Sequence, residues 1–274
     1  MTISLVGLYI YPIKSIRAVA LTKSNLDRWG LQYDRRYMLV DGQGRFISQR
    51  QHARMALIQP LPITSGWQLS APGVEDIFLP FELTSGKACR VTVWEDECAA
   101  IEAPAELSNW FQAFLKVDAK LVYFPDSSQR QVDLDYAKPG TQVSFSDGFP
   151  VLLAQTESLD KLNAEMSVPV DMLRFRPNIV LSGADAFAED HWSHIKIGSI
   201  DFDLVKPCSR CVIPSIDIAT GERGQQPILE VLKNKRRAAD GKVYFGQNLI
   251  HRTEGQLQLG DEAVVLCESL NVLL

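Results

Sequence analysis

The residues in this sequence best suited to chemistry are two cysteines, Cys208 and Cys211, spaced three positions apart. Lys206 and Arg210 flank them, and neighbouring cations favour the thiolate, the form of cysteine that binds metals and attacks electrophiles. A strand-like run at 200–205 leads into the motif. The sequence therefore predicts a metal-binding or reactive thiolate at the end of a strand, which the rest of the chain must position.

Three kinds of site remain open for this Cys-x-x-Cys motif. A thioredoxin-like redox pair requires a helix after the motif, which Pro214 and the β-branched residues at 212–216 disfavour. A zinc site needs four ligands, and His191 and His194 could join the two cysteines, although they are also ordinary surface histidines by pattern. The third alternative is a single thiolate on a soft or high-valent metal. The motif alone does not rank these alternatives.

Cations recur at the ends of other predicted strands, which is where loops build binding sites. They stand at Lys14-Ser15, Asp34-Arg35-Arg36, Arg50 and 174–178. Arginine forks grip phosphate with two parallel hydrogen bonds, and lysine acts as a point charge. Any one of these residues can be an ordinary solvated side chain. Taken together, they favour an anion site to which both halves of the chain contribute.

The elements that carry these residues are mostly strands. Short apolar runs with turn residues between them fill the first ~100 residues and suggest a barrel or sandwich. The turn at 41–44 predicts a hairpin over 37–48. Apolar spacing predicts a helix at 104–115, a second capped by Thr156, and a third opened by Pro227. The polar stretch 125–142 predicts a loop between domains or over a site. The fold class is α+β and β-dominated.

Composition narrows the class of protein. A net charge of −5 argues against a nucleic-acid-binding face, and the basic cluster at 233–237 is typical of the solvated end of a helix. The N-terminus lacks the features of a signal peptide, and no apolar run is long enough to span a membrane. Five cysteines indicate reduced thiols rather than a disulfide frame. We therefore expect a cytoplasmic protein.

Several segments together resemble the MOSC family, named for the C-terminal domain of molybdenum cofactor sulfurase. They are 11–15, 34–35, 175–180, 208–221 and 245–248. The sequence looks most similar to the branch with an N-terminal MOSC β-barrel domain, which holds the mitochondrial amidoxime-reducing component and its bacterial homologues. The resemblance implies an N-terminal β-barrel module at 1–120 and a C-terminal MOSC β-barrel domain at 121–268, with a few short helices.

The resemblance also implies roles for individual residues. Cys211 becomes the catalytic residue and the protein ligand of molybdenum in a molybdenum–molybdopterin cofactor (Mo-MPT), and Cys208 receives no ligand role. As a cysteine without such a role, Cys208 is expected to be a small buried hydrophobe. Residues implied to hold the pterin, its phosphate or the metal end of the cofactor are Lys14, Ser15, Arg35, Arg176, Asn178, Ser209 and Arg210. Mitochondrial relatives carry small polar residues just before the proline equivalent to Pro150. Here Gly148 and Phe149 occupy that place, so we expect Asp147 and Gly148 to contribute only in part.

The activity implied is the reduction of N-hydroxylated compounds, such as hydroxylamines and amidoximes. The sequence contains no Cys-x₄-Cys-x₂-Cys run, so electrons are expected from a separate ferredoxin- or flavin-type protein. Pyridoxal phosphate is not expected. One alternative is a carrier that passes on sulfur or the cofactor from Cys211 without reductase activity. Another is a non-catalytic domain stabilised by zinc.

Overall fold

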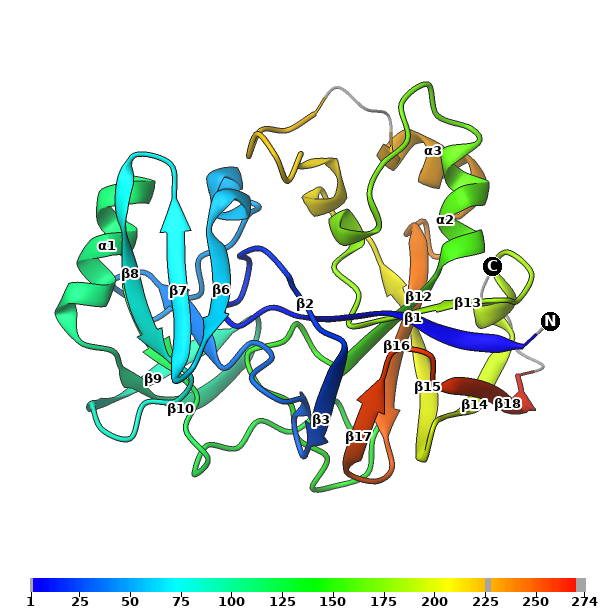
Figure 1. The fold of residues 1–274 in the computed structure, drawn as a ribbon, viewed down its shortest axis with the longest axis horizontal. Helices are drawn as coiled ribbons and strands as arrows, with labels where there is room; N and C mark the ends of the chain where they lie inside the picture. Colours follow the sequence, from blue (N-terminus) through cyan, green and yellow to red (C-terminus); the bar gives the residue numbers. More distant parts are fainter. Residues whose placement is uncertain (1, 225–227, 270–274) are drawn as a thin grey trace.

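The computed structural model describes residues 2–224 and 228–269. Strands dominate it, and the described residues contain three α-helices, α1 (Ala105–Leu115), α2 (Thr156–Asn163) and α3 (Ile228–Lys235). Figure 1 shows two lobes, one built around α1 and the other beneath α2 and α3. The predicted β-dominated α+β class is confirmed.

Seven strands of the second lobe close into a barrel, called here the barrel lobe. Each pairs with the next in the order β13 (Ile179–Ser182), β12 (Val151–Gln155), β16 (Tyr244–His251), β15 (Ile200–Ser209), β14 (Trp192–Ile197), β18 (Glu262–Glu268) and β1 (Ile3–Ile10). Strand β1 pairs antiparallel with both β18 and β13, and the second pairing closes the ring. Closure satisfies backbone groups that an edge strand would leave exposed.

The first lobe contains two smaller sheets. One follows the order β5 (Tyr37–Val40), β11 (Lys120–Tyr123), β10 (Asp96–Glu102) and β9 (Lys87–Val93), and the other joins β6 (Gln59–Ile63), β7 (Gly66–Ala71) and β8 (Val74–Pro80). The predicted hairpin after β5 forms, since Gly44 donates to the Asp41 carbonyl over 3.0 Å and Val40 pairs with Phe46.

Strand pairing links the two halves of the sequence. Strand β1, which also pairs antiparallel with the short strand β2 (Val19–Ala20), comes from the N-terminal half but belongs to the barrel. A third sheet joins β17 (Gly255–Gln258) to β3 (Lys23–Asp27) and β4 (Gly30–Leu31). Strand β11 begins at Lys120, where the domain boundary was predicted, and pairs with first-lobe strands. The boundary itself stays a prediction, but residues from both halves can share one site.

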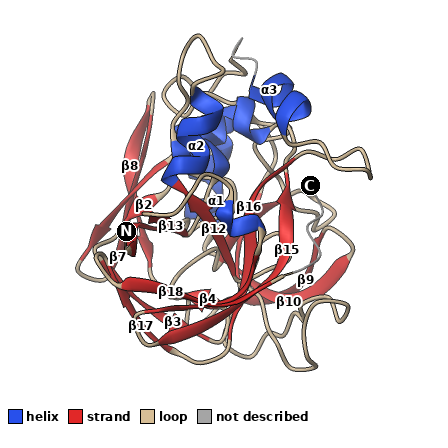
Figure 2. Ribbon diagram, turned by 90° about the vertical axis from the view of Figure 1, so that its right-hand side faces the viewer, coloured by secondary structure: helices blue, strands red, loops and turns tan. Residues whose placement is uncertain are grey.

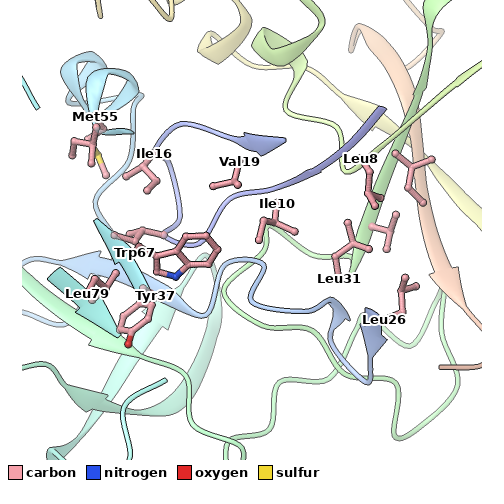
Figure 3. Packing of buried hydrophobic residues seen from close by; sticks show 14 of the residues in the cluster. Leu8, Ile10, Ile16, Val19, Leu26, Leu31, Tyr37, Met55, Trp67 and Leu79 are labelled. Atoms are coloured by element: carbon pink, nitrogen blue, oxygen red, sulfur yellow. The ribbon is translucent and has the colours of Figure 1, made fainter. Parts of the chain in front are cut away.

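One hydrophobic core crosses between the lobes. Figure 3 shows buried side chains running from Trp67 and Tyr37 in the first lobe to Leu8 and Leu26 beside the barrel. Each is at most 3% exposed, and burying such a side chain stabilises a fold by about 1.5–3 kcal/mol. The shared core fixes the lobes against each other, which a site built from both of them requires.

The helices follow their apolar spacing, with corrections at the ends. The apolar face of α1 is buried as predicted, and Figure 2 shows α2 and α3 together at one end of the barrel strands. The predicted cap of α2 is wrong, because Thr156 is already helical and the capping position is Gln155, which makes no side-chain cap. Pro227 lies outside the described residues, and α3 starts at Ile228.

The basic cluster after α3 is also not wholly solvated. Arg236 is buried and pairs with Asp190, because a buried guanidinium needs an anionic partner. Asp190 ends one of the four short 3₁₀ turns found among the described residues, which are η1 (Ala53–Leu57), η2 (Met172–Phe175), η3 (Ala188–Asp190) and η4 (Ile213–Ser215). None of the described helices is long and apolar enough to span a bilayer.

Candidate functional site

Strand β15 delivers the cysteine motif to the end of the barrel. It runs antiparallel to β16, and its register shifts between Leu204 and Lys206 and again between Pro207 and Ser209. Such bulges bend a strand and redirect its side chains, and they tolerate a proline, which has no N–H to donate. The motif therefore leaves the barrel wall at Ser209, with Cys211 just beyond the strand, as the sequence predicted.

Backbone contacts hold Arg210 and Cys211 in place. The N–H of Arg210 donates to the Val243 carbonyl over 2.8 Å, and its Nε donates to the Phe245 carbonyl over 3.0 Å. The Ile213 N–H points at the Cys211 sulfur over 3.5 Å. The sulfur is half-buried rather than enclosed, so it remains within reach of a ligand.

The structure removes two of the three alternatives for the motif. A 3₁₀ turn, η4, follows Cys211, and the neighbouring strands are antiparallel, so the strand–helix context of a thioredoxin-like pair is not present here. The described residues contain no cluster of three or more His, Cys, Asp or Glu side chains able to hold a metal. His194 instead lies 3.2 Å from Asp201. The zinc interpretation is therefore wrong for the described part of the chain.

Cys208 differs from its prediction. It was expected to be a small buried hydrophobe, but it is half-buried and lines the same cavity as Cys211. Partial burial raises the pKa of the Cys208 thiol above its usual value, although Arg210 opposes the shift. The raised pKa favours the neutral thiol form of Cys208.

One cavity lies in front of Cys211, and the structure brings every predicted site residue to its wall. These residues are Lys14, Ser15, Arg35, Asp147, Gly148, Arg176, Asn178, Ser209, Arg210 and Cys211. They come from both halves of the chain and from the loop between β11 and β12. The cofactor-binding and catalytic roles assigned to them stay predictions, but the spatial convergence is a property of the fold.

Two guanidinium groups from the cavity wall lie close to the ring of a buried tyrosine. The Arg35 and Arg176 guanidinium carbons lie 4.2 and 4.1 Å from the centre of the Tyr11 ring. The electron-rich ring faces let two like charges share a small space. Burial lowers the pKa of Arg176 to about 10, with Tyr11 opposing the shift and Arg35 adding to it. Arg176 therefore remains cationic near pH 7.

Asn178 ties this pair to the barrel. Its side-chain oxygen accepts from Arg35 over 3.0 Å and from the Leu152 N–H over 3.2 Å. Its amide donates to the Tyr9 carbonyl over 3.1 Å, so the side chain links β1 to β12. Arg176 is anchored separately, by donating to the Ile16 carbonyl over 2.7 Å.

Unusual backbone geometry concentrates around the cavity. Seven described non-glycine residues have positive φ, and three of them line it: Ser15 at 70°, Arg35 at 49° and Arg176 at 57°. L-residues rarely adopt this conformation, and such strain persists where the surrounding structure enforces it, often at functional sites. The three residues are therefore held by the fold rather than by local preference.

The loop before β12 supplies the acidic side of the cavity. Its position depends on Arg130, which is buried and which the sequence did not single out. Arg130 donates to the carbonyls of Ser144, Ser146 and Asp147 over 2.6–3.1 Å and to Asp96 over 2.8 Å. The predicted loop at 125–142 thus holds the adjoining segment over the site.

Other lining residues were outside the predicted site. Arg50 and Arg174 had been noted only as cations beside strands, whereas nothing in the local sequence pointed to Ser146 or Phe149. Arg174 donates through Nη2 to Asp217 over 2.6 Å. Asp217 lies in the segment after Cys211, so Arg174 connects the cavity wall to that segment.

The charge of the cavity wall favours an anion. Among the residues that the structure describes, one carboxylate, Asp147, lines it against six cationic side chains, Lys14, Arg35, Arg50, Arg174, Arg176 and Arg210. Three buried polar atoms on the wall have no hydrogen-bond partner among the described residues: Ser146 Oγ, Arg174 Nη1 and Arg210 Nη2. Buried polar atoms are normally satisfied, so water or a bound ligand must supply the partners of these three atoms.

Known proteins resemble this chain over most of its length. Residues 2–118 match the family described as MOSC N-terminal beta barrel domain, and residues 140–264 match the MOSC domain. The chain is 32% identical to human mitochondrial amidoxime-reducing component 1, covering 94% of this chain and 82% of that protein.

Two further proteins match this chain over most of its length. Human molybdenum cofactor sulfurase is 32% identical over 89% of this chain, which spans 30% of that protein. The match to a solved structure, the YUAD protein from Bacillus subtilis, covers 96% of this chain and 94% of the YUAD chain, with 15% sequence identity and a TM-score of 0.44. The chain therefore belongs to the MOSC family and is homologous to the mitochondrial amidoxime-reducing components.

Proposed function

We propose that this protein binds Mo-MPT and reduces N-hydroxylated compounds, namely hydroxylamines and amidoximes, with electrons from a separate ferredoxin- or flavin-type protein. The observation that carries the proposal is the half-buried Cys211 sulfur facing a cavity with six cations and three unpartnered buried polar atoms. Homology to amidoxime-reducing components over 94% of the chain supports the reaction class. A cytoplasmic location remains part of the proposal.

The residues present fit such a cofactor. Mo-MPT is an anion that carries a phosphate, and charge-assisted hydrogen bonds to it strengthen in a partly buried cavity. Arg35, Arg176 and Lys14 would hold its anionic groups, and Cys211 would be the protein ligand of the metal. The donors left free on Arg174 and Arg210 would complete the set of contacts.

In the proposed reaction, the cofactor and the protein contribute different things. When bound, the cofactor supplies the two-electron chemistry that cleaves an N–O bond, and the protein supplies binding, orientation and charge. The overall change is R–NHOH + 2 e⁻ + 2 H⁺ → R–NH₂ + H₂O, so an electron donor is required in each cycle. Burial lowers the pKa of Lys14 to about 8, partly offset by Asp147. Lys14 therefore keeps most of its charge at pH 7.

A second candidate is a carrier that passes on sulfur or the cofactor from Cys211. The observation that favours it is the 32% identity to human molybdenum cofactor sulfurase. A half-buried thiol beside cations also suits sulfur relay. Turnover of a hydroxylamine with an artificial electron donor separates the candidates, because a carrier gives none while still binding the cofactor.

The experiment is expression in a host that makes the cofactor, followed by measurement of molybdenum and pterin per chain and of benzamidoxime reduction. We expect Cys211→Ala to lose reductase activity with little change in thermal stability. Cys267→Ala is the matched control, because Cys267 is exposed on β18. Full activity and unchanged molybdenum content in Cys211→Ala would contradict the proposal.

A further inference from the structure

A wider groove continues from the cavity to the surface. It shares Cys208, Cys211 and Arg210 with the cavity. Beyond them, its walls come from both lobes, with the turn between β9 and β10 on one side and Lys206 of β15 on the other. A substrate that approaches Cys211 from solvent through this groove passes both walls.

Trp94, on the first-lobe wall, is unlike the other tryptophans. Trp94 is 46% exposed, whereas the other four tryptophans of the chain are at most 8% exposed. It occupies the β9–β10 turn with φ of +60°, a conformation that glycine or asparagine adopts readily and a bulky residue rarely does. A large aromatic side chain kept in strained backbone and left in solvent is not explained by folding stability.

The indole is nevertheless held firmly. Its Nε1 donates to Asp147 over 3.3 Å, and the Arg50 guanidinium carbon lies 4.5 Å from the ring centre. The Phe46 ring packs against it at 4.9 Å and an angle of 61°. Asp147 and Arg50 both line the cofactor cavity as well, so the indole is fixed relative to that cavity.

A second aromatic side chain lines the same groove. Phe149 borders both the cavity and the groove, and the edge of Tyr136 packs against it at 5.8 Å. The Lys206 ammonium lies 4.2 Å from the Tyr136 ring centre. The groove therefore offers rigid aromatic surface on separate elements, which suits a flat apolar group better than a flexible aliphatic one.

We propose that Trp94 is a specificity-determining residue that binds the aryl group of aromatic N-hydroxylated substrates and leaves their N–O group on the side of Cys211. This inference rests on the proposed reductase function for its substrate class. It assigns substrate selection to the first lobe, whereas Cys211 comes from the barrel lobe.

The first test reads binding without turnover. Benzamidoxime is titrated into the cofactor-loaded protein without electron donor, and tryptophan fluorescence and calorimetry are recorded, with acetamidoxime as the aliphatic comparison. We expect benzamidoxime alone to quench the solvent-exposed emission, and Trp94→Phe to abolish the quenching while retaining calorimetric binding. Equal affinity for both amidoximes in the wild type would overturn the inference. Selective binding without any turnover would instead overturn the proposed function and leave the inference standing.

The second test separates substrate binding from support of the cavity. In Trp94→Leu we expect KM for benzamidoxime to rise roughly five- to tenfold, the range that a lost aromatic contact gives. The kcat, the KM for acetamidoxime and the molybdenum content should stay unchanged, and Trp94→Phe should restore most of the benzamidoxime affinity. Equal losses for both substrates, or loss of molybdenum, would show that Trp94 only supports Arg50 and Asp147.

Discussion

The Lys14 ammonium donates a hydrogen bond to the Asp147 carboxylate over 2.5 Å, which joins the loop after β1 to the loop before β12. Lys14 is 4% exposed, so burial lowers its pKa to about 8, and Asp147 limits the fall. Desolvation raises the pKa of the Asp147 carboxyl group, but the charges of Lys14 and Arg50 outweigh it and hold that pKa well below its usual range. The pair sets how long the Lys14 side chain stays cationic as pH rises.

Asp147→Asn should shift the pH dependence of anion binding to lower pH. Losing the carboxylate removes the contacts that raise the Lys14 pKa, so the pKa falls below about 8. A lysine loses its charge as pH rises through its pKa, and the share of anion affinity that Lys14 contributes is lost with it. Sulfate stays a dianion over this range, so calorimetric titration of cofactor-free protein from about pH 6 to about pH 9 reports the protein alone.

The control for that series is Asp126→Asn, because Asp126 is an exposed partner of Arg36 away from the cavity. Its midpoint should match the wild type. A midpoint in Asp147→Asn equal to or above that of the wild type would contradict the assigned coupling between Lys14 and Asp147.

Asp217→Ala should loosen the segment that follows Cys211. The Asp217 carboxylate accepts from the Ala219 and Thr220 N–H groups over 2.8 and 3.1 Å and from Arg174 over 2.6 Å. These interactions hold the pKa of Asp217 below its usual value, and the backbone hydrogen bond from Ala219 has the largest effect. Losing them should speed amide hydrogen exchange across 213–224 by roughly tenfold, since a charged hydrogen bond contributes about 1.5–3 kcal/mol.

Mass-spectrometric hydrogen exchange checks this, with Asp41→Ala as the control. Asp41 accepts from two backbone N–H groups in the hairpin turn after β5, so its loss should affect exchange there and leave 213–224 unchanged. Asp217→Asn should fall between Asp217→Ala and the wild type, because its amide oxygen can still accept. Unaltered exchange in Asp217→Ala would show that the segment is held by other contacts.

Arg130→Met should destabilise the protein by about 3 kcal/mol, because it leaves buried carbonyl oxygens of the 144–147 segment unpaired. Urea unfolding measures the change in free energy. Arg90→Met is the matched control on β9, since Arg90 is exposed and only faces Glu97 over 3.4 Å. An exposed pair of this kind contributes at most about 1 kcal/mol. Similar effects of the two substitutions would show that Arg130 does not organise the loop.

Gly246→Ala tests the close approach of β16 to β12. Gly246 has φ of +76° and a Cβ there would lie 2.5 Å from the Leu153 carbonyl oxygen. Gly140 also has a positive φ, +92°, but open space around its Cβ position. We expect Gly140→Ala to cost about 1–2 kcal/mol from backbone strain alone, and Gly246→Ala distinctly more in the same urea series. Equal losses of stability in the two variants would mean that β16 can move away from β12 without further destabilising the protein.

The sequence predicted the elements that depend on local chemistry. The apolar stripe of α1 and the Asp41–Gly44 turn form where their residue types indicated, because helix and turn preferences act over a few neighbouring residues. Resemblance in motif order also identified ten residues that share one cavity. Local preference failed at α2, where Gln155 rather than Thr156 takes the capping position.

Contacts between distant segments were decided only by the tertiary structure. Arg130 reaches across 14–17 residues to the loop it holds, and Trp94 meets Asp147 at a separation of 53 residues. No local pattern marks either residue, since a buried arginine and an exposed tryptophan acquire their surroundings when the lobes pack. The sequence by itself determined the helix α1, the turn after β5 and the cysteine motif at the end of β15. Only the closure of β1 into the barrel decided that basic groups from both halves would face one sulfur, because strand pairing over that distance depends on the whole fold.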